Sequence, residues 1–231
     1  MSESALIDPD KLAQQLRSQS LINDPLCGDV PPEQLQQRSP LWPAATRWSA
    51  IRLIAVTEQG SRRLEEYLFH PLGADSGVPI HPGCELPVAM MFAKRADGTS
   101  CARLYSAHQL VAARAPILPV DTQLVPDRGG DDILVRYFPT LHSANLEASV
   151  ALFEPDGYLQ HSNGETYRGH ERLRIDFAKF FQSGGIHLKY CNRTDSGPRT
   201  ALEVYMPSGR PALAVYERGR TGLIGAARLY L

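Results

Sequence analysis

Matching short segments occur in the same order in both halves of the chain, and this repetition constrains the fold more than any other feature. The first half carries Thr57-Glu-Gln-Gly60, Leu64-Glu65, Ala89, Asp97-Gly98 and Ala102-Arg-Leu-Tyr105. The second half carries Thr194-Asp-Ser-Gly197, Leu202-Glu203, Ala214, Thr221-Gly222 and Ala227-Arg-Leu-Tyr230. An ordered series of this kind indicates a duplicated structural unit. Convergent composition of unrelated strands is the alternative.

The chain of 231 residues has room for two small domains. Residues 115–130 contain three prolines and end in a glycine pair, which is typical of a linker. We therefore expect a first copy over residues 1–114 and a second over 131–231. Only residues 1–20 are available for the first helix of the first copy. That copy should therefore be degenerate, and either structural or part of an internal pseudo-dimer.

Charge and hydropathy exclude several classes of protein. The net charge is −1, and the basic residues are scattered, so the chain lacks the basic stripe of a nucleic-acid binder. It has no apolar run long enough to span a membrane and does not begin with a secretory signal. We expect a cytoplasmic protein whose four cysteines are buried thiols.

Residue patterns predict an α+β layout in both halves. In the first, helices are expected over 8–22, capped by Asp8 or Asp10, and from 31, with strands over 48–57, 62–69, 86–94 and 99–105. In the second, helices are expected over 131–153, kinked at Pro139, and over 170–183. A short strand and turn lie between these helices, and strands follow over 186–194, 199–206, 211–218 and 222–230. Such an antiparallel sheet would curve over the helices and leave a hollow.

Residues 137–173 resemble a known family. The segment from Leu141 through Phe153-Glu-Pro-Asp156-Gly157 to Gly169-His-Glu171, with the strand motif Ala214-Val-Tyr-Glu-Arg-Gly219, is similar to the nuclear transport factor 2-like superfamily. SnoaL-like polyketide cyclases, ketosteroid isomerases, scytalone dehydratase and limonene-epoxide hydrolase belong to it. The resemblance implies a cone-shaped curved antiparallel sheet packed on helices (the cystatin-like fold), in two tandem copies here. This fold hosts both enzymes and non-enzymes.

The resemblance also implies roles for single residues. Tyr137 falls on the oxyanion-donating tyrosine of the ketosteroid isomerases, and His161 falls on their general-base aspartate. Ala214 falls near their second oxyanion donor, an aspartic acid, so that donor is lacking. A histidine base with a tyrosine donor is more similar to the dehydratase and cyclase members.

The chemistry of the candidate catalytic residues agrees with these roles but leaves alternatives open. Imidazole exchanges protons near neutral pH, so His161 could act as the base, or it could be a surface residue of a polar turn. Tyr137 could stabilise an oxyanion, or it could be a core tyrosine. Glu203 would orient the base if its face of the strand looked into the hollow, and would be solvated if that face looked outward.

The remaining candidates are side chains that could line the hollow and bind a ligand. They are Phe138, Tyr190, Asn192, Tyr205, Tyr216 and Arg228. No cofactor is expected, because the sequence lacks nucleotide-binding glycine motifs. No metal site is expected either, since His70, His81 and Cys84 fit no compact zinc pattern.

These features favour a cofactor-independent enzyme that performs acid/base chemistry on a hydrophobic, oxygenated small metabolite. Cyclisation, isomerisation and dehydration all need only a base, an acid and a dry pocket. The SnoaL-like resemblance implies secondary-metabolite biosynthesis and a homodimer. The alternative is a non-catalytic module that binds a small ligand or serves in assembly.

Overall fold

The computed structural model describes residues 5–24, 27–39, 41–43, 47–72, 85–106 and 133–231. The chain forms two compact units. Unit 1 comprises Met1–Gln123 with Tyr230–Leu231, and unit 2 comprises Leu124–Leu229. The predicted linker, residues 115–130, lies outside the described residues, as do His81 and Cys84. No helix in the described ranges is long and apolar enough to cross a membrane.

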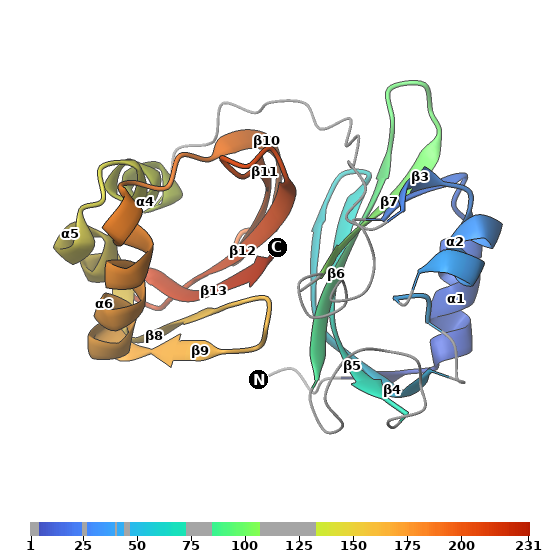
Figure 1. The fold of residues 1–231 in the computed structure, drawn as a ribbon, viewed down its shortest axis with the longest axis horizontal. Helices are drawn as coiled ribbons and strands as arrows, with labels where there is room; N and C mark the ends of the chain where they lie inside the picture. Colours follow the sequence, from blue (N-terminus) through green and yellow to red (C-terminus); the bar gives the residue numbers. More distant parts are fainter. Residues whose placement is uncertain (1–4, 25–26, 40, 44–46, 73–84, 107–132) are drawn as a thin grey trace. The chain divides into compact units, whose positions relative to one another are not determined.

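Unit 1 consists of one sheet with helices on one of its faces (Figure 1). In chain order its elements are β1 (Ala5–Ile7), α1 (Pro9–Arg17), β2 (Leu21–Asp24), β3 (Gly28–Val30), α2 (Pro32–Arg38), β4 (Trp48–Gln59), β5 (Arg62–Pro71), β6 (Leu86–Lys94) and β7 (Ser100–Ser106). The strands are ordered β1-β4-β5-β6-β7-β2-β3 in the sheet.

The first helix is shorter than the sequence predicts. Asp8 caps α1 by accepting a hydrogen bond from the Asp10 amide, and Leu12 and Leu16 are buried as expected. The helix ends at Arg17, however, and not at residue 22. The Ser20 amide donates to the Ser100 carbonyl at 3.1 Å, which ties the chain to β7 and starts β2. Pairing with a distant strand thus overrides the local helical pattern.

Large apolar side chains fill the space between the sheet and helices of unit 1. Trp42 and Trp48 are both 1% exposed, and the indole N–H of Trp48 donates to the Trp42 carbonyl at 3.1 Å. The Trp48 ring packs edge-on against Phe69 at a centroid distance of 4.9 Å. Leu12, Leu16 and further buried residues of the helices and strands complete this core.

Unit 2 has the same layered construction, with its helices on one face of a second curved sheet (Figure 1). Its elements are α4 (Ile133–His142), α5 (Leu146–Ala151), β8 (Phe153–Gln160), β9 (Thr166–Arg168), α6 (Gly169–Phe180), the 3-10 turn η2 (Phe181–Ser183), β10 (Lys189–Asp195), β11 (Arg199–Tyr205), β12 (Pro211–Arg218) and β13 (Ile224–Tyr230). The strand order is β10-β11-β12-β13-β8-β9.

The predicted helix over 131–153 is in fact two helices. Pro139 lies inside α4 without ending it. The break comes after His142, where Ala144 adopts a left-handed backbone with φ of 52°. Asn145 then caps α5 by accepting a hydrogen bond from the Ala148 amide at 3.1 Å. The apolar pattern predicts one continuous helix, but the cap at Asn145 starts a second helix within it.

The two units share one topology. β4-β5-β6-β7-β2-β3 corresponds strand for strand to β10-β11-β12-β13-β8-β9, and β1 is an addition to unit 1. In both, the strand after the first helical segment pairs in parallel with the last strand. Ile22 lies opposite Ala102 there, and Leu159 lies opposite Ala227. The predicted fold class, α+β with two tandem copies, is confirmed.

Candidate functional site

The sheet of unit 2 has one face toward the helices, and cross-strand pairing identifies the residues on it. Residues directly opposite each other in an antiparallel pair share a face. Tyr190 lies opposite Val204, and Thr200 lies opposite Tyr216. The rings of Tyr190 and Tyr216 pack against Phe138 of α4 at centroid distances of 4.7 and 5.9 Å. These positions therefore face the helices, and three predicted ligand-binding residues lie together there.

Glu203, Asn192 and Tyr205 lie on the other face. Glu203 and Tyr205 flank Val204 on β11, so they point away from the helices. The register of β10 shifts between Tyr190 and Asn192, and this bulge brings Asn192 opposite Glu203. Without the bulge, Tyr190 and Asn192 would share a face, as the sequence predicts. The structure thus corrects the expectation that Glu203 looks into the hollow.

Arg228 also belongs to the face away from the helices. Its guanidinium donates to Glu217 at 2.9 Å and to the Tyr158 hydroxyl at 3.2 Å. Glu217 follows Tyr216 on β12 and therefore points the opposite way. Burial raises the pKa of Glu217, but Arg228 and Arg199 outweigh it and hold that pKa below its usual value. Arg228 is thus part of an ion-pair network on this face of the sheet.

His161 lies on the helix-facing side and contacts a buried carboxylate. It follows β8, where its amide donates to the Glu165 carbonyl at 2.9 Å in the turn before β9. Its Nε2 lies 2.9 Å from Oδ2 of Asp176 on α6. The Asp176 residue is only 3% exposed. A carboxylate can only accept, so Nε2 carries the proton and Nδ1 is the nitrogen that can take up another.

Two aromatic rings restrain the His161 imidazole. Phe180 stacks on it at a centroid distance of 5.3 Å with an interplanar angle of 26°. Tyr167 of β9 meets it edge-on at 5.4 Å and 90°. With Asp176 at one nitrogen and rings at its face and edge, the imidazole is held in one orientation. Such restraint suits a proton-transfer residue.

Tyr137 is at the centre of the aromatic cluster of unit 2. It is 2% exposed, and its ring centroid lies between 5.6 and 6.4 Å from those of Phe138, Phe153, Phe177 and Tyr216. Burial raises the pKa of Tyr137 well above its usual value, and the negative charge of Asp176 adds to this. Its phenol therefore stays protonated, within electrostatic range of the Asp176 carboxylate.

Asp176 is the residue that the sequence analysis missed. It lies three positions after Leu173 and directly before Phe177, on the buried side of α6. A carboxylate on the apolar stripe of an amphipathic helix is unusual, because burying its charge is costly without a partner. The sequence signal that could have identified Asp176 was therefore its position on the apolar face of the helix predicted over 170–183.

In unit 1, Asp24 occupies the place of His161 and accepts hydrogen bonds from neighbouring polar groups. Asp24 follows Ile22 as His161 follows Leu159, and it is fully buried. It accepts from the Ser39 hydroxyl at 2.8 Å and from the Cys27 amide at 3.0 Å. These bonds fix the β2–β3 turn and the end of α2. Asp24 is thus a structural anchor.

The alignment of the two repeats must be shifted by one residue on β5 and β11. Thr57 lies opposite Leu64, and Thr194 lies opposite Ala201. Counting from these pairs, Glu66 and not Glu65 holds the place of Glu203. Glu65 instead faces α1, where it accepts from Gln15 at 3.1 Å and from the Tyr67 hydroxyl.

No protein-family model matches the sequence, and no curated protein matches it. Solved structures similar to part of the chain include a SnoaL-like protein of unknown function from Burkholderia thailandensis, with 13% identity over 42% of this chain and 89% of the other, at a TM-score of 0.39. A hypothetical protein with a ketosteroid isomerase-like fold from Catenulispora acidiphila, in complex with trimethylamine, has 16% identity over 45% of this chain and 87% of the other, at a TM-score of 0.38. A putative polyketide cyclase from Sinorhizobium meliloti has 14% identity over 42% of this chain and 92% of the other, at a TM-score of 0.38.

Each of these likenesses covers less than half of this chain and most of the other chain. At such identities and TM-scores they say nothing about activity, and the strand order described above carries the fold assignment.

Proposed function

We propose that unit 2 catalyses acid/base chemistry on a small, apolar, oxygen-bearing molecule without a cofactor, with His161 as the base. The contact between His161 and Asp176 carries this proposal. A carboxylate that is 3% exposed has lost most of its hydration, which is costly unless a partner compensates. Within the described residues, the hydrogen-bond partner of Asp176 is His161. Enzymes use such pairs to orient and activate an imidazole.

The proposed roles follow from the geometry. Asp176 holds the Nε2 proton and stabilises the imidazolium that forms when Nδ1 removes a proton from the substrate. The same Nδ1 then returns the proton at another atom, which completes an isomerisation, a dehydration or a ring closure. Tyr137, protonated and near Asp176, donates to the substrate oxygen that gains negative charge. Glu203 and Arg228 have no part in these steps.

A probe that reports only proton removal tests this proposal without knowledge of the substrate. 5-Nitrobenzisoxazole opens to a coloured phenolate when a base removes its one acidic C–H proton. We expect His161→Gln to slow this reaction roughly 10²-fold or more, in line with the usual contribution of a positioned base. His187→Gln, a change of an exposed histidine in the same unit, is the matched control and should leave the rate unchanged. Equal rates for the two variants would refute the assignment.

A non-catalytic ligand-binding or assembly module is the second candidate. The packing of Tyr137 among four other rings favours it, because rings in mutual contact fill an interior. This reading predicts that His161→Gln changes stability but not the rate of proton removal. Secondary-metabolite biosynthesis and a homodimer belong to the first proposal and rest on the resemblance.

A further inference from the structure

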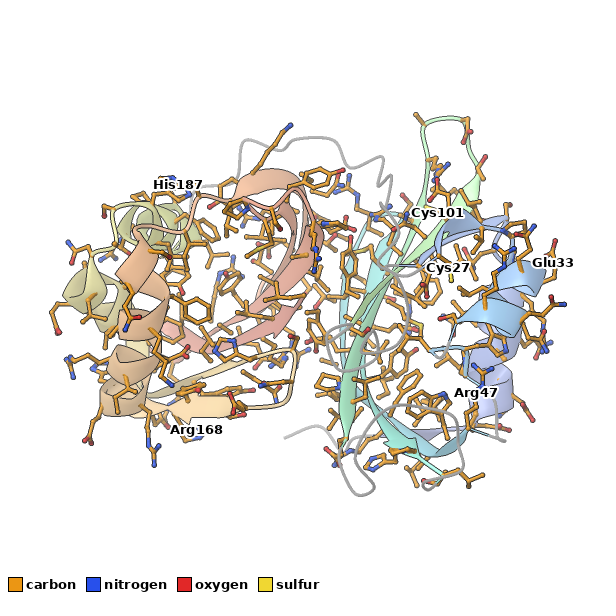
Figure 2. The ribbon with its side chains drawn as sticks, viewed as in Figure 1. Cys27, Glu33, Arg47, Cys101, Arg168 and His187 are labelled. Atoms are coloured by element: carbon orange, nitrogen blue, oxygen red, sulfur yellow. The ribbon has the colours of Figure 1, made fainter. Side chains whose placement is uncertain are left out.

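The hydroxyl of Tyr190 is buried without a hydrogen-bond partner among the described residues. Tyr190 lies near the start of β10, on the helix-facing side of the sheet, where its ring packs on Phe138. Figure 2 places His187, which precedes it by three residues, beside α4. The hydroxyl is thus in the same layer of unit 2 as Tyr137 and Tyr216.

An unpartnered buried hydroxyl is uncommon, because it loses its hydration without gaining a hydrogen bond in return. A phenylalanine at this position would give the same ring packing without that cost. The hydroxyl therefore has a use other than holding the apo fold together. A ligand that supplies its missing partner would account for it.

The surroundings define the kind of partner. Burial raises the pKa of Tyr190 far above its usual value, so the phenol stays protonated and can donate. The rings of Phe138 and Tyr216 lie in the same layer. Burying a charged oxygen among such rings costs far more than burying an uncharged one. An uncharged acceptor oxygen therefore fits best.

We propose that the Tyr190 hydroxyl anchors the ligand by donating to an uncharged carbonyl oxygen, so that the site takes neutral ketones, aldehydes or esters with an apolar body. The rings of Phe138 and Tyr216 provide the apolar contact next to that oxygen. This inference rests on the proposed function only in placing the reacting end of the same ligand at His161. Tyr190 thereby determines which ligands bind, while His161 removes the proton from the bound ligand.

A matched pair of ligands tests the anchor. 2-Acetylnaphthalene and 2-ethylnaphthalene have nearly the same shape, but only the first carries a carbonyl oxygen. We expect the protein to bind the ketone about tenfold more tightly in calorimetric titration, the gain typical of one buried hydrogen bond. Tyr190→Phe should bind both ligands equally. Tyr205→Phe, on the sheet face away from the helices, should keep the preference. No ketone preference in the unaltered protein, or its persistence in Tyr190→Phe, would overturn the proposal.

Thermal unfolding without ligand gives a second readout. Removing a hydroxyl that has no partner should leave the unfolding midpoint unchanged or raise it. Tyr67→Phe is the comparison, because the Tyr67 hydroxyl donates to the buried Glu65 and its loss should lower the midpoint. A loss in Tyr190→Phe as large as that in Tyr67→Phe would show that the hydroxyl serves the fold, and the proposal would fail.

The two proposals fail separately. If His161→Gln leaves the rate of proton removal intact while Tyr190→Phe abolishes the ketone preference, the catalytic assignment is lost and the anchor stands. If His161→Gln abolishes catalysis while the ketone preference survives in Tyr190→Phe, the anchor is lost and the base assignment stands.

Discussion

Unit 1 and unit 2 share one strand order but differ in what lies between sheet and helices. In unit 1, Trp42 and Trp48 fill this space, and the buried Asp24 is engaged by its neighbours. In unit 2, the same layer contains the His161–Asp176 pair and the Tyr190 hydroxyl, which has no hydrogen-bond partner in the part of the chain that the structure describes. A duplicated fold can therefore keep its backbone plan while one copy fills this layer with tryptophan rings and the other places a histidine–carboxylate pair in it. We infer that the catalytic site lies in unit 2.

Asp176, the partner of His161, and Asp24, which holds the place of His161 in unit 1, give the largest expected contrast. Asp176→Asn should slow the opening of 5-nitrobenzisoxazole by roughly 10²- to 10⁴-fold, because the imidazolium loses its counter-charge. Asp24→Asn should leave that rate unchanged and lower stability by about 1–3 kcal/mol, since it disturbs buried hydrogen bonds. Rates come from initial velocities, and stability from urea unfolding. A catalytic loss in Asp24→Asn with unit 2 folded would break the comparison.

The filled core of unit 1 predicts a large loss of stability. Trp48→Ala removes a buried ring that packs on Phe69, and should cost about 3–5 kcal/mol. Leu6→Ala, at a side chain that is 75% exposed, should cost little. Below its unfolding midpoint, Trp48→Ala should keep the rate of proton removal. If it unfolds outright, the milder Trp48→Phe supplies the test, and a loss of rate in the folded variant would contradict the division of roles.

The Cys27 thiol makes the stability of unit 1 depend on pH in the alkaline range. Burial and, next, Asp24 raise the pKa of this thiol to about 11. An unfolded chain loses the thiol proton from about pH 9 upward, while the folded chain keeps it, so this contribution to stability is present below pH 9 and is lost between about 9 and 11. Alkylation of Cys27 by iodoacetamide, followed by mass spectrometry, should accelerate up to about pH 11. A plateau from pH 9 would contradict the shift, and Asp24→Asn should move the curve to lower pH.

The smallest effect concerns the face of unit 2 that points away from the helices. Glu203→Gln should leave the rate of proton removal unchanged, because Glu203 flanks Val204 and points away from His161. Arg228→Lys should also leave the rate of proton removal unchanged, since the Arg228 guanidinium donates to Glu217 and Tyr158. A marked slowing in either variant would restore these residues to the mechanism.

The sequence predicted the elements well and the faces of the strands less well. The strand over 86–94 and that over 211–218 have the predicted bounds, because their apolar runs are bounded by turn residues. The orientation of Asn192 could not be predicted, since a bulge at Cys191 leaves no signature in residue alternation. The break at Ala144 is similarly hidden within an apolar pattern.

Part of the candidate site could be predicted and part could not. Tyr137 and His161 were named from the resemblance, and the structure places both in the helix-facing layer of unit 2. Identifying Asp176 required knowing that the turn after β8, which holds His161, packs against α6, which is tertiary information. Its position on a buried helical face was only an indirect signal.

A double-mutant cycle on His161 and Asp176 tests the central claim most directly. If Asp176 acts only through the imidazole, the variant His161→Gln/Asp176→Asn should open 5-nitrobenzisoxazole no more slowly than His161→Gln alone. Losses that multiply in the double variant, or single variants as fast as the unaltered protein, would contradict the account.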